Sequence, residues 1–337
     1  MKLTSPEQWV CSIPYLAGFT PEMSVVTTFI TNEGEVLLTM RTSIDPILDN
    51  PDLFIDTVAT AAARAGAESA VHAIYAGTVP LDRDMPFLSL MVDQIKEIDG
   101  LGFLDLLQVH VTDNGNTYWR VICDCCAFDS YTVPGFNAID QSVRDAVAVK
   151  FIGAGVAPVG KRSDIDDEFE LMSISDETRS NAFVSNASDH DAYSKERSIH
   201  GAQWCIAQLQ VPLDDWTTED LIRFGLFISE SVKIRDNVLY QLIDMSQDQT
   251  RETYKKFLNV YRASDEEQRA ATACIVGVCA MMLGDGARAR VALDLSEQAN
   301  PTYSYTRLLQ ASLQMAMPPS VFAELLSSAR QTDNLLV

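Results

Sequence analysis

Positively charged residues are scarce in this chain of 337 residues, which has 25 lysines and arginines against 47 aspartates and glutamates. The formal net charge of −22 repels phosphate backbones, so we expect no direct binding of nucleic acid through a broad basic surface. Anionic membrane surfaces are disfavoured for the same reason. Solubility and repulsion of non-specific partners both explain such acidity, and mimicry of nucleic acid toward a basic partner is a third explanation.

Targeting and membrane-spanning segments are also missing from the sequence. Residues 1–7 lack the basic stretch and apolar core of a secretory signal. The longest nearly apolar run, Ala270 to Leu283, is about 14 residues long, which is shorter than the roughly 20 residues that cross a bilayer. Seven cysteines are an odd number and are not spaced as a disulfide framework. We therefore expect a cytoplasmic protein without membrane association.

Signatures of catalysis are absent too. The four histidines are dispersed with no His-x-x-x-His pair, and we expect His72, next to Val71 in an apolar run, to be a core residue. No Gly-x-Ser-x-Gly elbow occurs, and neither does a phosphate loop or a dinucleotide-binding glycine motif after a strand. The sequence therefore predicts no catalytic residue and no cofactor, and it leans away from an enzyme.

The N-terminal half has the patterns of a mixed α/β or α+β domain. A helix capped at Thr4-Ser5 should stop near Ile13, because Pro14 follows. The expected sheet region then runs in the order β-β-α-β-α-β-β, with helices packed on the sheet. Its segments are a hairpin of Ser24 to Thr31 and Glu35 to Ile44, a helix from Pro51 to about Ala65, a strand from Ser69 to Ala76, a helix from about Met85 to Ile98, and a second hairpin of Phe103 to Thr112 and Asn116 to Ile122.

The second half changes in character after Pro158. Ser163 to Glu177 contains seven acids and no base, so we interpret residues 161–200 as a partly mobile acidic and polar connector. Apolar residues recur at helical spacing from Thr217 onward, where Thr217 and Asp220 form a plausible capping pair. The predicted domains are therefore 1–160, α/β, and 201–337, all-α.

One helical hairpin in that second domain resembles a single tetratricopeptide-type repeat. Gly277 and Ala289 would be the small residues at the helix crossings, Gly284 would make the turn, and Pro301 would follow the second helix. Larger side chains at Gly277 or Ala289 would push the two helices apart. Stable arrays need about three repeats, so we expect one hairpin within an all-α domain more than a peptide-binding groove.

A cysteine cluster follows the second predicted hairpin of the sheet. Cys123, Cys125 and Cys126 are candidate zinc ligands, with His110 or His72 as a fourth. Paired zinc thiolates usually have two to four residues between them, and these do not. Buried thiols are therefore the favoured interpretation, with a metal site and a redox switch as alternatives.

Aromatic and basic residues form the candidate recognition surface. Pro14, Gly18 and Pro21 should bend a loop that carries Tyr15 and Phe19, with Ser24 able to cap it. Trp119 and Arg120 would lie on opposite faces of one strand, Trp119 favoured as core and Arg120 as an ion-pair partner. The structural interpretation of this loop is that it simply packs over the sheet. The functional alternative is that one recognition surface is formed by Tyr15, Gly18, Phe19, Ser24, Arg41, Trp119 and Arg120.

The opening motif Pro14-Tyr15-Leu16-Ala17-Gly18-Phe19-Thr20-Pro21-Glu22-Met23-Ser24 resembles that of the actinobacterial domain-of-unknown-function family 4192, which phages of those bacteria also carry. Further matches are Trp119 before Cys123, the Cys125-Cys126 pair, residues 153–158, Arg235-Asp236, and residues 284–309. The single residue between Cys123 and the pair is shorter than the spacer in the family. The resemblance implies membership and architecture, but no reaction.

Three functional hypotheses follow from these observations. The leading one is a non-catalytic interaction or adaptor protein, in which the α/β domain recognises a partner or ligand and the helical domain adds a second surface. The second is an enzyme or small-ligand-binding protein, which requires Arg41, Arg120, Trp119 and the Tyr15–Phe19 loop to converge on one pocket. The third is an acidic mimic of nucleic acid.

Overall fold

The computed structural model describes residues 2, 4–76, 93–112, 115–123, 137–153, 156–186, 195–315 and 317–333. The chain divides into two compact units. The first unit comprises residues 1–162 and 315–318, and the second comprises residues 163–314 and 319–337. Among the described residues, no helix is both long and apolar enough to cross a membrane.

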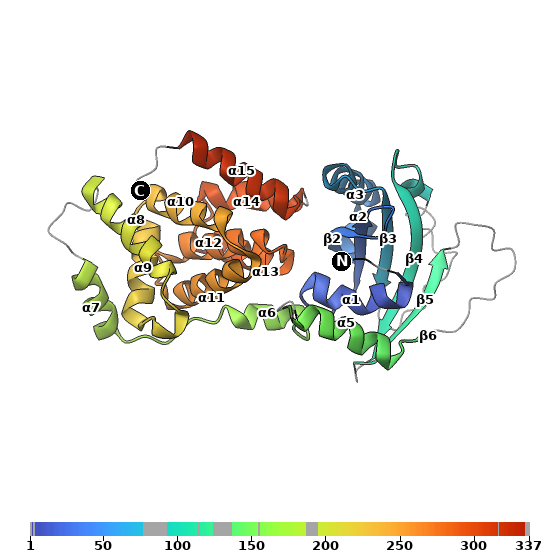
Figure 1. The fold of residues 1–337 in the computed structure, drawn as a ribbon, viewed down its shortest axis with the longest axis horizontal. Helices are drawn as coiled ribbons and strands as arrows, with labels where there is room; N and C mark the ends of the chain where they lie inside the picture. The colour runs from blue at the N-terminus through green and yellow to red at the C-terminus, as the bar shows by residue number, and fades with distance from the viewer. Residues whose placement is uncertain are drawn as a thin grey trace, which may run out of the picture. The chain divides into compact units, whose positions relative to one another are not determined.

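The first unit is built on a six-stranded mixed sheet in the order β2-β1-β3-β4-β5-β6 (Figure 1). β3 and β4 run parallel, and the other neighbouring strands pair antiparallel. This arrangement confirms the expected mixed sheet with packed helices. The strands are β1 (Ser24–Ile30), β2 (Val36–Ser43), β3 (Ser69–Tyr75), β4 (Gly102–Val111), β5 (Thr117–Cys123) and β6 (Asn137–Ala138), of which β6 was not predicted.

Helices cover both faces of this sheet. On one face, α1 (Pro6–Ala17) packs Trp9, Val10 and Ile13 against residues such as Val26 and Leu107, and α5 (Gln141–Gly153) contacts α1. On the other face, α2 (Ile44–Asp49) and α3 (Pro51–Ala65) cover a second core. That second core contains Val25, Phe29, Ile47, Phe54, Val58, Ile74 and Leu106. We call these the α1 face and the α3 face.

The first helix is longer than predicted. Ser5 caps it by accepting a hydrogen bond from the backbone N–H of Gln8, but the helix continues through Pro14 to Ala17. Proline removes one backbone hydrogen bond and usually ends a helix. Here the preceding turn is fixed by the fully buried Ile13, and Gly18 closes the helix in the left-handed conformation at φ 82°. Tertiary packing therefore outweighs the local preference of the proline.

Two other expected elements of this half lie partly outside the described residues. Of the helix predicted from Met85 to Ile98, only residues 93–98 are described. In the second hairpin, Asp113 and Asn114 are not described, while Gly115 has φ 77° and donates to the carbonyl of Thr112. The left-handed glycine is the conformation that such a turn demands.

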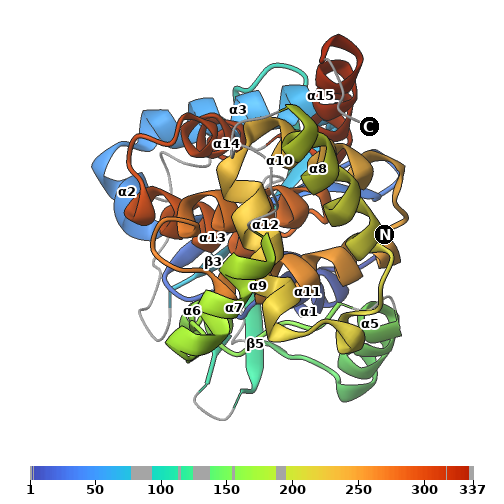
Figure 2. The same ribbon diagram turned by 90° about the vertical axis from the view of Figure 1, so that its left-hand side faces the viewer.

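All the named elements of the second unit are helices (Figures 1 and 2). α12 contacts α9, α10, α11, α13, α14 and α15 and is therefore the centre of this unit. The α-helices are α6 (Arg162–Glu168, whose first residue belongs to the first unit), α7 (Asp176–Asn186), α8 (Lys195–Leu209), α9 (Thr218–Glu230), α10 (Val232–Tyr240), α11 (Gln247–Ala263), α12 (Arg269–Met282), α13 (Gly286–Ala299), α14 (Ser304–Gln314) and α15 (Pro319–Thr332). Two short 3₁₀ helices, η1 (Leu213–Asp215) and η2 (Gln241–Asp244), join them.

Two sequence expectations for this half have different outcomes. The capping pair at the start of α9 is confirmed, because Thr217 and Asp220 each accept a backbone hydrogen bond from the other. The segment 161–200, by contrast, was expected to be a connector, and its described part contains α6, α7 and the start of α8. Ile165 and Phe169 are buried, so their apolar side chains fix this acidic segment to the unit.

The packing of α12 against α13 explains why the residues at positions 277 and 289 are small. A Cβ atom added at Gly277 would lie 3.0 Å from Cδ2 of Leu293 and 3.7 Å from the carbonyl oxygen of Ala289. Ala289 is itself fully buried. Gly284 makes the turn with φ 74°. Helix backbones can approach this closely only where side chains are missing or small, as Gly277 allows here.

Candidate functional site

The opening loop and strand β2 bring three of the predicted recognition residues together. Arg41 on β2 donates from Nε to the hydroxyl of Ser24 over 2.8 Å, and Ser24 donates in turn to the carbonyl of Glu22. The guanidinium carbon of Arg41 lies 5.6 Å from the ring centroid of Phe19, which is a cation–π contact. Phe19 is buried, whereas Arg41 is exposed. The loop therefore holds the arginine in a defined position at the surface.

Tyr15 lies in α1 and not on the expected loop, because the helix continues to Ala17, and both Tyr15 and Gly18 have structural partners. The ring of Tyr15 stacks on Phe151 of α5, with centroids 4.8 Å apart and planes 14° from parallel. Burial raises the pKa of the Tyr15 phenol. Gly18 ends α1, and its carbonyl accepts a hydrogen bond from Val159, beside the β-bridge between Phe19 and Val159. The chain around residue 159 therefore runs along this loop.

Trp119 and Arg120 do not complete the surface that the second hypothesis required. Paired residues on neighbouring strands share a face. Arg41 pairs with Val26, so it lies on the α1 face, where Trp119 is half-buried against the core. Arg120 pairs with Gln108 and donates to its Oε1 over 2.7 Å, and Gln108 pairs with Ile74 of the α3 face. The two arginines therefore lie on opposite faces of the sheet, and the predicted convergence is wrong.

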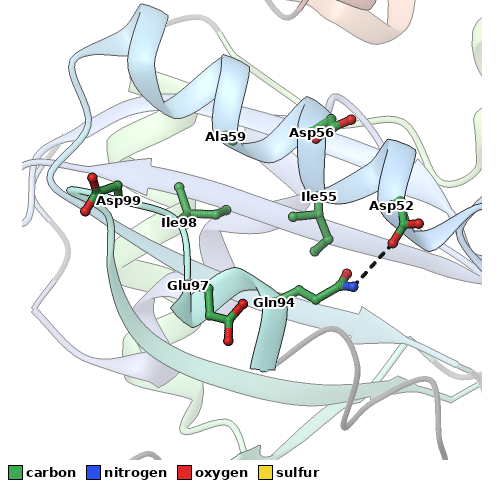
Figure 3. Close-up of a pocket in the computed structure, with 8 residues that line it drawn as sticks. All are labelled: Asp52, Ile55, Asp56, Ala59, Gln94, Glu97, Ile98 and Asp99. Carbon is green, nitrogen blue, oxygen red and sulfur yellow. Dashed lines mark hydrogen bonds between the residues drawn. The ribbon is translucent and has the colours of Figure 1, made fainter.

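An open pocket of about 590 Å³ lies between α3 and residues 94–99, where sequence analysis predicted nothing (Figure 3). Ile55 and Ile98, both half-buried against the core of the α3 face, form its apolar floor with Ala59. Its remaining lining residues are polar: Asp52, Asp56, Gln94, Glu97 and Asp99. The floor is therefore apolar and continuous with the core, while the rim is acidic.

Hydrogen-bond acceptors dominate this acidic pocket. Its four carboxylate residues are all exposed. Gln94 donates from its amide nitrogen to Oδ1 of Asp52 over 3.3 Å, the dashed contact in Figure 3. Its Oε1 atom is buried and has no hydrogen-bond partner in the described part of the chain. Lys96, the neighbouring base, extends instead over the ring of Phe103. A ligand that donates hydrogen bonds and carries positive charge matches this lining.

His72 is a core residue, as expected. Its side chain is fully buried on β3, with Nδ1 2.9 Å from the hydroxyl of Thr27 and its ring stacked on Phe103 at 5.5 Å. Burial lowers the pKa of His72 to about 3. Its Nε2 atom has no partner among the described residues. The neutral ring therefore fills the interior of the α3 face.

The second unit buries a cluster of charged and phenolic groups. Arg235 on α10 donates from Nε and one terminal nitrogen to Oδ1 of Asp236, and from the other to the hydroxyl of Tyr303 over 2.6 Å. Its guanidinium carbon lies 4.2 Å from the ring centroid of Tyr305. Burial, which outweighs the effect of Arg235, raises the pKa of Asp236. All three guanidinium nitrogens of Arg235 donate to these neighbours, which is typical of a structural ion pair.

A partly buried arginine ties α6 to the hairpin. Arg288 binds Glu168 of α6 through two hydrogen bonds and Asp285 through a third at 2.8 Å. Hydrogen bonds to the two carboxylates raise the pKa of Arg288 despite its burial. Glu168, an acid of the expected connector, therefore holds α6 against the hairpin.

The cysteine cluster lies largely outside the described residues. Cys125 and Cys126 are not described, and Cys123 is described only as the backbone that ends β5. In the described part of the chain, no three histidine, cysteine or acidic residues are arranged to hold a metal ion. The four cysteines described as free thiols are buried, and burial raises the pKa of the Cys11 thiol to about 11. Such thiols are poor nucleophiles.

Comparisons with known proteins place the chain in a family. No curated protein matches it, and no solved structure does. One family model, described as a domain of unknown function (DUF4192), matches residues 6–320, which span parts of both units. The chain therefore belongs to the domain-of-unknown-function family DUF4192.

Proposed function

We propose that this chain is a non-catalytic interaction protein whose α/β unit accepts a cationic side chain of a protein partner in the acidic pocket. The observation that carries this proposal is the lining of the pocket. Four carboxylates and the Oε1 of Gln94, which has no hydrogen-bond partner among the described residues, are arranged around an apolar floor. A lysine side chain has the matching chemistry, because its methylene stem prefers apolar surface and its ammonium group offers three donors.

The strength expected from this pocket is modest. An exposed ion pair contributes about 0–1 kcal/mol, so four carboxylates supply a few kcal/mol at most. A single lysine should therefore bind in about the millimolar range, and several lysines on one partner should bind more tightly through avidity. Because the carboxylates are exposed, salt should weaken the interaction, with a screening length of about 8 Å at physiological ionic strength.

The helical unit supplies the second surface in this proposal. The hairpin of α12 and α13, which we interpret as tetratricopeptide-like, would support it. Leu308 on α14 and Leu325 on α15 are exposed, with 61% and 51% of their surface accessible. Exposed large apolar side chains of this kind are common at interaction surfaces, although single ones also occur elsewhere. The acidic-mimic hypothesis, the cytoplasmic location and the actinobacterial or phage origin remain predictions.

The direct test is a titration with a capped trilysine peptide, monitored by NMR of the full chain labelled with ¹⁵N. The side-chain amide of Gln94 is the reporter, because its nitrogen contacts Asp52 and its oxygen needs a donor. We expect a saturable shift of that amide signal, and no shift with capped triglutamine. Raising the salt from 50 to 500 mM is expected to weaken the binding several-fold.

A pair of variants with equal charge change provides the control. Asp52→Asn with Asp56→Asn removes two carboxylates from the pocket, and Asp45→Asn with Asp49→Asn removes two exposed carboxylates from α2. Both pairs have the same spacing on a helix, so general electrostatics should change similarly. Only the first pair should abolish trilysine binding. Equal loss in both variants would show that the peptide senses net charge and not this pocket.

A further inference from the structure

The acidic pocket beside α3 has a carboxylate at each of its two ends (Figure 3). Asp52, in the first turn of α3, lies at one end, where the side chain of Gln94 donates to its Oδ1. Asp99 lies at the opposite end, and the apolar floor lies between the two. Asp56 and Glu97 flank that floor on its two sides. The lining is therefore two-ended, with its apolar surface in the middle.

None of the four carboxylates forms an ion pair with a base in the part of the chain that the structure describes. Lys96, the base between Gln94 and Glu97 in the sequence, extends over the ring of Phe103 instead. Like charges that share one pocket repel one another, so a cation at each end stabilises the pocket more than a cation at one end alone.

The end at Asp52 also offers a neutral acceptor. The Oε1 atom of Gln94 is buried and has no hydrogen-bond donor among the described residues, while its amide nitrogen is directed to Asp52. Buried polar atoms normally have a partner. An ammonium group at this end can donate to the carboxylate and to the amide oxygen together, because it has three donors.

The length of α3 sets the length of a ligand that reaches both ends. From Asp52 to Ala59, which belongs to the floor, the helix rises about 10 Å. Each bond of an extended carbon chain is about 1.5 Å long and advances somewhat less than that. A stem of about eight carbons between two amines therefore spans this length, whereas the shorter stem of a lysine reaches one end only.

From this arrangement we infer that the pocket also binds a free linear aliphatic diamine, which lies along the floor with one ammonium group at each end. Such amines are charged at neutral pH, as the lysine side chain is, and their methylene groups gain by contact with apolar surface. The site is the one proposed above for a lysine of a protein partner. The inference therefore rests on that function and adds its regulation, because the diamine displaces the lysine.

The test uses the full chain labelled with ¹⁵N, titrated at constant ionic strength with 1,8-diaminooctane, 1,3-diaminopropane and 8-aminooctan-1-ol. The short diamine has both charges without the length, and the amino alcohol has the length with one charge. The reporters are the side-chain amide of Gln94 and the backbone signals of residues 94–99. We expect 1,8-diaminooctane to bind saturably, with a dissociation constant on the order of millimolar and at least about threefold more tightly than either control. It should also weaken the binding of capped trilysine.

The outcomes separate this inference from the proposed function. If trilysine binds but the long diamine binds no more tightly than the amino alcohol, the pocket holds one cation, and the inference fails while the proposed function stands. A long diamine that binds without weakening trilysine binding occupies another place and equally overturns the inference. If neither trilysine nor the diamine shifts the reporters, both proposals fail.

A pair of variants tests the second end directly. Glu97→Gln with Asp99→Asn should lower the affinity for 1,8-diaminooctane to that for the amino alcohol, whose single ammonium group still has the Asp52 end. Asp45→Asn with Asp49→Asn makes the same charge change on α2, outside the pocket, and should leave the difference between the two ligands as in the wild type. An equal effect of both pairs would show that the diamine senses net charge, which contradicts a two-ended site.

Discussion

The buried histidine of the α/β unit gives a quantitative prediction about pH. Burial lowers the pKa of His72 to about 3 in the folded chain, against an ordinary value of 6.5. A histidine with a depressed folded pKa stabilises the fold fully above its unfolded pKa, and this contribution is lost as pH falls toward the folded value. Between pH 7.5 and 4.5 the loss amounts to two pKa units, or about 2.7 kcal/mol of unfolding free energy.

The assay compares wild type with His72→Leu, which fills a similar volume without a titratable group. Urea unfolding should be followed by tryptophan fluorescence with Trp204 and Trp216 replaced by phenylalanine, so that Trp9 and Trp119 report on the first unit alone. Other groups titrate in both proteins and cancel in the comparison.

The leucine variant should lose about 2.7 kcal/mol less than the wild type between pH 7.5 and 4.5. Its stability at pH 7.5 will also differ, because Thr27 loses the bond to Nδ1, but that difference is independent of pH. Equal pH dependence in the two proteins would refute the reasoning, since it would mean that His72 binds a proton as easily in the folded chain as in the unfolded one.

Two further predictions concern the helical unit. Gly277→Leu should destabilise it by at least about 1–3 kcal/mol in thermal or urea unfolding, because even a Cβ lies 3.0 Å from Leu293, whereas Gly286→Ala in α13, whose Cβ would lie 3.8 Å from Leu313, should be neutral or slightly stabilising. A stable Gly277→Leu variant would contradict the close helix crossing. Arg235→Ala should cost about 3–5 kcal/mol by leaving Asp236 unpaired, and a loss below 1 kcal/mol in urea unfolding would show that water replaces the arginine.

Local sequence signals predicted many of the elements but not their partners. The Thr217 cap and the glycine turn at position 115 follow from short-range chemistry that a sequence displays directly. Pro14 was misinterpreted, because the packing that holds its helix comes from the sheet and from Phe151. The burial of Arg235 was hidden in the same way, since Tyr303 follows it 68 residues later.

The candidate sites likewise combine contacts that the sequence could predict with contacts between distant residues that it could not. Ser24 and Arg41 belong to one hairpin, so their meeting follows from adjacent strands. Arg41 and Arg120 are separated by β1, β3 and β4, and their faces depend on the register of each pairing. The pocket was missed because Asp52 and Gln94 lie 42 residues apart. The spacing of Asp52 and Asp56 on one helix face was the available signal.

The separation of the two sites bears on the kind of function. Catalysis requires a reacting atom within about 3 Å of several groups at once. In the α/β unit the positioned cation, Arg41, and the group of acceptors beside α3 lie on opposite sides of the sheet, whose buried strands stand between them. No single small substrate can touch both. Under the proposed function, Asp52→Asn with Asp56→Asn should therefore weaken the binding of trilysine, whereas Arg41→Gln, on the other side of the sheet, should leave that binding unchanged.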